Sequence, residues 1–272
     1  MQAMLQQAGL YLFLFQLWPL QERCHMTKHL AYLIVSQRGL TIAELALIVV
    51  VFGLIVAGAL KGCEMMSRAG IINTVKQIEK IDSALLRFNR RYRALPGDIA
   101  DAPRRVPGCD ATCKPNSGIK SNGIIDSSPE ARQNPGMESV LFWRHLGYAG
   151  LLDFVNKDPG NPDSIKAGDG VPRAKAGGAF VIGYHKAGEN LAHLIAGSAP
   201  TGHYLTLSAV PYKPLGAQAN WPLNARQLRV MDEKLDDGKP NNGKFLAGGV
   251  EACTDTKTKN AGYAASGRAG CS

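Results

Sequence analysis

One carboxylate stands inside an apolar stretch of the sequence that is as long as a membrane span. Residues 40–60 contain a single charged side chain, Glu44, and Arg38 and Gly39 come just before them. About 20 apolar residues are enough for a helix to cross a bilayer. A carboxylate there is costly unless it meets a cation or takes up a proton. Glu44 is therefore the first candidate functional residue, and a side chain that reaches the membrane surface is the alternative.

The cysteines are the second set of candidates. The chain has 6 of them, which would permit disulfides in an exported domain. Cys109 and Cys113 are close enough in sequence for a tight bridge, and two free thiols are the alternative. Zinc is less favoured, because no second Cys or His pair lies near them in the sequence. Cys253 and Cys271 enclose a loop whose closure would stabilise the fold by about 3 kcal/mol.

An oxygen-rich group of side chains lies near the C-terminus. It contains Asp232, Asp236 and Asp237, followed by Asn241 and Asn242. Carboxylates and carbonyls are ligands that calcium prefers, but this spacing matches no EF-hand loop. We therefore favour a turn with solvated acids, and calcium binding is the alternative.

The sequence contains no recognised catalytic constellation. Its 6 histidines lack H-E-x-x-H spacing, and G-x-S-x-G is absent. Residues 238–244 begin like a phosphate-binding loop, but Phe245 stands where a Ser or Thr must hold magnesium. We expect neither an enzyme nor a bound cofactor.

The elements that would position these residues begin with a long helix over residues 40–95. Its first part is apolar all round, so we expect residues 40–61 to lie in a membrane or an assembly. Residues 62–95 follow an amphipathic pattern, which predicts one buried face. Pro96 and the following Gly-Asp end the helix. The predicted buried positions are Ile71, Val75, Ile78, Ile81, Leu85, Phe88 and Tyr92.

Residues 96–272 should form a globular head. A second helix is predicted over residues 137–154, and a short helix should run from an Asn224 cap to Lys234. Alternating apolar residues predict three strands, over 179–184, 191–196 and 203–209.

Residues 38–45, R-G-L-T-I-A-E-L, resemble the N-terminus of type IV prepilins and of the pseudopilins of type II secretion. That family has a Gly before its cleavage site, an apolar first residue after it, and a Glu at the fifth position. Gly39, Leu40 and Glu44 fill these places, with Leu40 in place of the usual Phe. The motifs Y-R-A-L-P-G-D at residues 92–98 and W-R-H-L at residues 143–146 also look like a subgroup of this family. An ordinary signal anchor with one acidic residue is the alternative.

The resemblance implies how the chain is processed. Residues 1–39 would be a leader, or a shorter one if Met26 is the true start. Prepilin peptidase would cut between Gly39 and Leu40, and the new amino group of Leu40 would be methylated. Glu44 would then meet that amine in its own or a neighbouring subunit. Basic residues before the apolar stretch favour a cytoplasmic leader and a periplasmic head, with one pass through the bacterial inner membrane.

The resemblance also implies the fold and the function. The fold would be α+β, with the long helix packed on a small antiparallel sheet that has long loops. A disulfide between Cys253 and Cys271 would close the C-terminal region, and some pseudopilins bind calcium in that region. The chain would be a structural subunit of a type II secretion pseudopilus or a type IV pilus, and its partners would be prepilin peptidase, other pilin-like subunits and the inner membrane. A minor pilin of DNA uptake and a membrane-tethered periplasmic enzyme are the alternatives.

The charge bears on these alternatives. The net charge of +9 suits nucleic acid, anionic lipid or acidic neighbours equally. Four arginines cluster around Tyr92, at the predicted end of the long helix. We expect a solvated face or pairing with acids of the next subunit there, and we do not expect nucleic acid as a partner. The four are Arg87, Arg90, Arg91 and Arg93.

Overall fold

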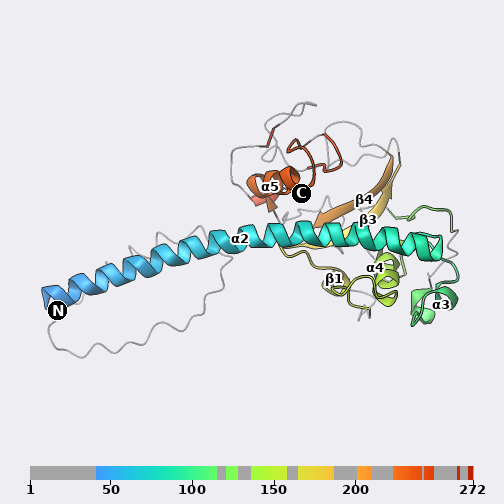
Figure 1. Ribbon diagram of the computed structural model, residues 1–272, viewed down its shortest axis with the longest axis horizontal. Helices are drawn as coiled ribbons and strands as arrows, with labels where there is room; N and C mark the ends of the chain where they lie inside the picture. The colour runs from blue at the N-terminus through green and yellow to red at the C-terminus, as the bar shows by residue number, and fades with distance from the viewer. Residues whose placement is uncertain are drawn as a thin grey trace, which may run out of the picture. The chain divides into compact units, whose positions relative to one another are not determined.

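The computed structural model describes residues 41–114, 121–127, 136–157, 165–186, 201–209, 223–240, 242–247, 262–263 and 269–271. The chain divides into two compact units, residues 1–66 and residues 67–272. The long helix α2 (Ile42–Tyr92) contributes residues to both units (Figure 1). The boundaries expected after residues 61 and 95 stay predictions.

The described part of the first unit is the apolar start of α2. Its 18-residue window of mean hydropathy 2.6 has no buried residue, and the helix is long and apolar enough to cross a membrane. A signal sequence or a core helix can satisfy the same measure, but a core helix would bury these side chains. The exposure of this segment means that its apolar surface is not covered by the described residues.

α2 ends at Tyr92, three residues before the predicted end. Arg93 takes a left-handed conformation with φ 52°, and its amide still donates to Asn89 O at 2.8 Å. Pro96 disfavours the helical conformation at Leu95, so the chain leaves the helix before it reaches the proline. A guanidinium nitrogen of Arg105 donates to the terminal carbonyl of Tyr92 and so satisfies one of the last helical acceptors.

The second helix, α4 (Glu138–Tyr148), is shorter than the predicted range 137–154. Gly150 has φ +71°, and Leu151 N donates back to Leu146 O at 3.0 Å. Gly150 N donates to Gly147 O at 3.1 Å, which completes a Schellman motif. The prediction was too long because leucines after this glycine continued the apolar spacing, although the backbone had already turned.

The sheets are small. β3 (Ala179–His185) pairs antiparallel with β4 (Gly202–Ser208), as the alternation predicts, and residues 191–196 lie outside the described part of the chain. Two short pairs accompany them: β1 (Lys166–Ala167) with β2 (Gly170–Val171) in parallel, and β5 (Leu223–Asn224) with β6 (Ala269–Cys271) antiparallel. The remaining short elements are α3 (Ala102–Arg105) and a 3-10 turn, η1 (Ala111–Cys113). The fold is therefore α+β.

The predicted cap at Asn224 is present. Its side chain accepts from Gln227 N at 2.9 Å, and the Gln227 side chain accepts from Asn224 N at 2.9 Å. This capping box satisfies two amides at the start of α5 (Ala225–Leu235). α5 then packs Leu228 and Met231 against Ile71 and Val75 of α2.

The main core lies between α2, α4 and β3. Phe88 of α2, Trp143 of α4 and Phe180 of β3 belong to one buried cluster, and these elements lie close together in Figure 1. Polar contacts fix the helix as well, because Gln77 donates to Arg173 O at 3.1 Å and accepts from Lys175 N at 2.9 Å. The second part of α2 is therefore an integral part of the second unit.

Candidate functional site

Glu44 lies in the first turn of α2 and is hydrogen-bonded there. Its Oε2 accepts from Thr41 N at 2.9 Å and from Thr41 Oγ1 at 2.8 Å. In return, Thr41 Oγ1 accepts from Glu44 N at 3.3 Å. This is a capping box, which satisfies two backbone amides at the start of a helix. The S/T-x-x-E signal for it was present in the sequence as T-I-A-E, and our sequence analysis missed it.

The surface that follows Glu44 is almost entirely apolar. Ile42 is 89% exposed and Leu54 is 69% exposed. An apolar surface of this extent marks a site for lipid or for another protein. Gly39 and Leu40 lie outside the described residues, so cleavage and methylation at that junction stay predictions. The other large apolar side chains exposed along this segment are Leu45, Leu47, Ile48, Val49, Val50, Val51, Phe52, Ile55, Val56 and Leu60.

The Y-R-A-L-P-G-D and W-R-H-L motifs of the second unit meet at His145. Gly97 N donates to His145 Nδ1 at 2.9 Å, so this nitrogen is the acceptor of the ring. His145 Nε2 then carries the proton and faces Cys113 O at 3.2 Å. Burial lowers the pKa of His145 to about 4, and nearby Arg144 acts in the same direction. The neutral imidazole thus joins the turn after α2 to η1.

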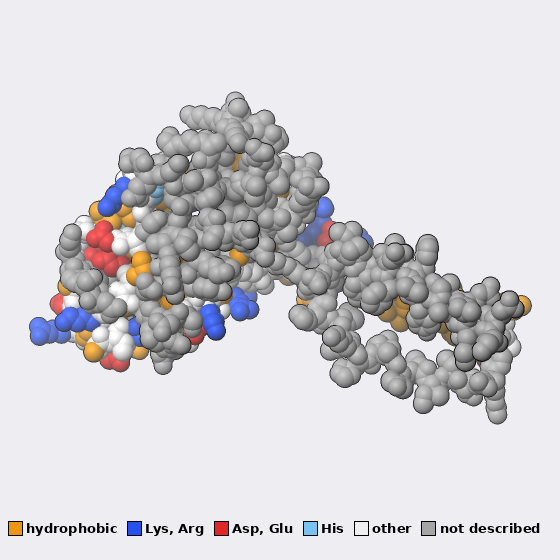
Figure 2. All heavy atoms as spheres, turned by 180° about the vertical axis from the view of Figure 1, so that it is seen from behind, with side chains coloured by type: hydrophobic (Ala, Val, Ile, Leu, Met, Phe, Trp, Pro, Cys, Tyr) orange, Lys and Arg blue, Asp and Glu red, His pale blue; other side chains and the backbone are white. Residues whose placement is uncertain are grey.

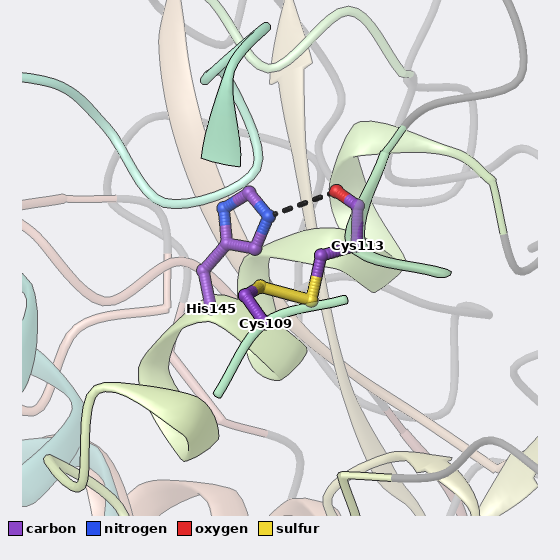
Figure 3. Close-up of side chains that lie close together, drawn as sticks. All are labelled: Cys109, Cys113 and His145. Atoms are coloured by element: carbon purple, nitrogen blue, oxygen red, sulfur yellow. Dashed lines mark hydrogen bonds between the residues drawn. A yellow bond between two sulfur atoms is a disulfide. The ribbon is translucent and has the colours of Figure 1, made fainter. Parts of the chain in front are cut away.

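Figure 3 shows how His145 lies beside the disulfide of Cys109 and Cys113. The bridge joins Cα atoms 5.7 Å apart. One donor atom of each of the three residues lies within 4.8 Å of the others, a grouping that would suit zinc if the cysteines were reduced. The sulfurs are bonded to each other and both ring nitrogens contact backbone groups, so the arrangement is structural. His145 is 32 residues from Cys113, which hid it from a search for local metal spacing.

Gly97 must be a glycine for two reasons. Its φ is +88°, a region that side chains rarely adopt, and a Cβ there would lie 2.3 Å from Glu138 O. This close approach lets the Gly97 amide reach His145. The P-G-D part of the first motif therefore serves the packing of α2 on α4.

Two buried carboxylates and the imidazole of His203 hold the loop of residues 121–127. Asp98 accepts from Asn122 N at 3.2 Å and from Gly123 N at 2.7 Å, and His203 Nε2 accepts from Ile125 N at 3.1 Å. Glu138 also accepts from the amide of Asp126. These side chains come from the end of α2, from α4 and from β4, so the loop ties three elements together.

The ionised form of the carboxyl groups in this cluster is costly to bury. Burial raises the pKa of Glu138 to about 7, and the charges of Asp98 and Asp126 add to the rise. Burial also raises the pKa of Asp98, against the hydrogen bonds from Gly123 and Asn122. For His203, burial lowers the pKa and the charge of Asp98 opposes this. No local sequence pattern predicts this cluster, because its members are far apart in the chain.

The guanidinium group of Arg144 also holds η1 in place through hydrogen bonds. It donates to Thr112 O at 2.5 Å, to Thr112 Oγ1 at 2.8 Å and to Lys157 O at 3.1 Å. Asp110 caps the same turn by accepting from Thr112 N at 2.8 Å. The W-R-H-L motif therefore supplies two polar side chains, Arg144 and His145, that both bind the disulfide-bridged segment.

The three candidate calcium ligands do lie together, with carboxylate oxygens within 4.8 Å of one another. Asp236 accepts from the amides of Lys244 and Phe245, and Asp237 accepts from Lys239 N at 2.9 Å. These bonds build the turn that the sequence analysis favoured. The calcium alternative stays a prediction.

Asp232 differs from its two neighbours because it is completely buried. Its Oδ2 accepts from the hydroxyl of Tyr263 at 2.8 Å. Burial raises the pKa of Asp232 to about 6, and the hydrogen bond from Tyr263 opposes the rise. The contact fastens the C-terminal region to α5.

The predicted bridge between Cys253 and Cys271 is not tested. Cys253 lies outside the described residues, and for Cys271 only the backbone is described, where it pairs with Leu223 in β6–β5. Where this region is described, the pairing of β6 with β5 and the hydrogen bond of the Tyr263 hydroxyl hold it.

No family model, curated protein or solved structure matches the chain. The pilin resemblance therefore rests on the residues quoted above. Within the described residues, the polar clusters bind backbone groups, and the largest unsatisfied surface is the apolar start of α2.

Proposed function

We propose that the chain is a pilin-like structural subunit, which prepilin peptidase cuts after Gly39 and which assembles through α2. The observation that carries the proposal is the contrast along this one helix. Up to Met66 its large apolar side chains are exposed, and from Ile71 onward one face is buried in an α+β unit. A helix of this kind can lie in lipid or among other subunits at one end while it anchors a folded unit at the other.

Glu44 has a specific part in this proposal. The capping box directs both Thr41 donors to Oε2, so the carboxylate is held at the start of the helix. Cleavage would place a charged amine on Leu40, one residue before Thr41. The carboxylate would neutralise that amine in the same subunit or in a correctly staggered neighbour, where an unpaired charge would be costly. Glu44 would thus select the register of assembly.

The proposal also fixes the orientation. Residues 1–39 would stay on the cytoplasmic side of the inner membrane and the second unit would lie in the periplasm. A type II secretion pseudopilus and a type IV pilus are both consistent with this arrangement. The structure of the subunit does not choose between them.

Processing is the direct test. The chain should be expressed with a prepilin peptidase, and the mature N-terminus should be sequenced. We expect Leu40 as the first residue, and we expect Gly39→Val to leave the precursor uncut, because the peptidase site accepts almost no side chain there. Gly53→Val is the matched control, since a Cβ at Gly53 meets no atom within 4 Å. A mature protein that begins elsewhere would contradict the proposal.

Assembly is tested separately with Glu44→Gln. This variant keeps a side chain that can accept from Thr41 but removes the charge. We expect normal cleavage and loss of filaments, seen by electron microscopy and by fractionation of sheared material. Normal filaments from Glu44→Gln would show that the carboxylate serves only as a helix cap.

A further inference from the structure

Six arginines surround the C-terminal end of α2. All of them are exposed, and Arg105 connects the two groups that they form. It donates to Tyr92 O at the end of α2, and its second guanidinium nitrogen lies 3.7 Å from Asp101 Oδ1. The arginines of α3 therefore lie beside those of α2. We call this group the arginine surface: Arg87, Arg90, Arg91, Arg93, Arg104 and Arg105.

The arginine surface is not balanced by acidic side chains of the described residues. Asp101 pairs with Arg105, and the Arg91 guanidinium lies 5.4 Å from the centre of the Tyr92 ring. No ion pair is formed by Arg87, Arg90, Arg93 or Arg104 within the described part of the chain. The helix dipole favours cations in the last turn, but it accounts for only part of this charge.

We propose that the arginine surface binds a carboxylate-rich segment of a different protein chain. The group contains arginines and no lysines. A guanidinium presents a planar fork that matches a carboxylate with two hydrogen bonds, whereas lysine offers a point charge. Several guanidinium groups at the end of one helix would bind successive acidic side chains of an exposed segment.

A second copy of this chain is a poor occupant. A second copy is itself basic, with a net charge of +9 for the full chain including residues 1–39, and this positive charge opposes docking on the arginine surface. The acidic cluster of the chain is also engaged, because Asp236 and Asp237 accept hydrogen bonds from their own loop. The partner should therefore be a chain that is more acidic than this one.

Nucleic acid and lipid fit less well. Single-stranded nucleic acid needs exposed aromatic rings for stacking, and Tyr92, the aromatic residue among these arginines, is buried. Interfacial binding to lipid needs a large apolar face beside the charges. Leu86 is the exposed large apolar side chain beside Arg87. Within the described residues, the arginines therefore stand without the exposed rings that a single strand requires and without the apolar face that lipid requires.

The inference names the kind of partner for the subunit proposed above and rests on that proposal for its biological setting. Binding at the arginine surface does not require cleavage at Gly39. A failed processing test and a failed binding test would thus be distinguishable.

The test measures binding of a fluorescent ten-residue peptide of alternating Glu and Ser to the full-length chain in detergent. A triple variant, Arg90→Gln, Arg93→Gln and Arg104→Gln, removes three charges of the arginine surface. The control removes three charges elsewhere through Lys166→Gln, Lys175→Gln and Lys244→Gln, all at exposed residues. We expect the arginine variant to weaken binding by about tenfold and the lysine variant to weaken it by less than about threefold.

Parallel arms use an oligonucleotide of the same charge, vesicles that contain anionic lipid, and sedimentation of the chain alone. An equal loss of peptide affinity in both triple variants would overturn the proposal, since it would show only an effect of net charge. Tighter binding of the oligonucleotide or the vesicles, or self-association that the arginine variant abolishes, would also overturn it. Melting curves of both variants verify folding, and Arg90→Gln alone replaces the triple variant if that variant unfolds.

Discussion

Phe52 and Phe88 belong to the same helix, but their surroundings are opposite. Phe52 is 60% exposed, whereas Phe88 is fully buried between α2, α4 and β3. Helix formation does not separate the two regions, because both have the same backbone structure. The difference is whether the described residues cover the apolar side chains.

The two regions also use their polar residues differently. In the first region Glu44 is bound within its own helical turn. In the second, Gln77, Asp98 and His145 bind backbone groups of distant segments. On the face drawn in Figure 2, basic and acidic side chains lie among apolar ones where the second unit is described. The contacts of Glu44 are thus local, whereas these polar contacts of the second region join segments that are distant in sequence.

The largest expected effect comes from the core. Phe88→Ala should destabilise the second unit by about 3–5 kcal/mol, because it removes a fully buried ring and leaves a cavity. Phe52→Ala removes the same atoms from an exposed position and should leave the unfolding midpoint of that unit unchanged. Thermal melts of both full-length variants in detergent measure this. If both variants lost a similar amount of stability, the two positions would not differ in burial as described.

The disulfide should have the second largest effect. Cys109→Ser combined with Cys113→Ser opens a loop of about five residues, which corresponds to about 2 kcal/mol in the chain-entropy model. Without reductant the variant should therefore melt at a lower temperature than the original chain, and with reductant the two chains should melt alike, because reductant opens every bridge in both. Equal melting temperatures without reductant would show that the bridge between Cys109 and Cys113 does not stabilise the unit.

These two regions were not equally predictable. The apolar stretch, the amphipathic repeat and the Asn224 cap are local patterns, so the sequence predicts the start of α2, its buried face and α5. The end of α4 was overestimated, because a Schellman turn at Gly150 changes direction without interrupting the apolar pattern. His145 and Glu138 were missed as members of polar clusters, because their partners are distant in sequence and only the tertiary fold brings them together.

The third effect concerns the C-terminal region. Tyr263→Phe removes the donor to buried Asp232 and should cost about 1–3 kcal/mol at neutral pH, because a buried acceptor loses its partner. Tyr148→Phe at the end of α4 is the matched control. Limited proteolysis of the tail and melting curves measure the change. A protected tail in Tyr263→Phe would assign its restraint to strand β6 or to a bridge between Cys253 and Cys271.

The last effect is a change in pH dependence at Glu138, which comes from the titration of one carboxyl group. Burial raises the pKa of this carboxyl to about 7 from its ordinary value of 4.5, so the folded chain holds a proton that the unfolded chain releases. The stability that Glu138 contributes is therefore greatest at low pH and falls as the pH rises from about 4.5 to 7.

Glu138→Gln keeps an oxygen that can accept from Asp126 N and removes the titration. Relative to the original chain, the variant should thus become more stable as the pH rises through that window, and the difference should level off above pH 7. His145 acts in the opposite direction, because its pKa is lowered to about 4 and its contribution is lost as the pH falls below 6.5. Both chains contain His145, Asp98 and Asp232, so the difference between their melting temperatures isolates Glu138. A difference that stays constant from pH 4.5 to 8 would show that Glu138 remains ionised in the folded unit, and that the cluster around residues 121–127 is open to water.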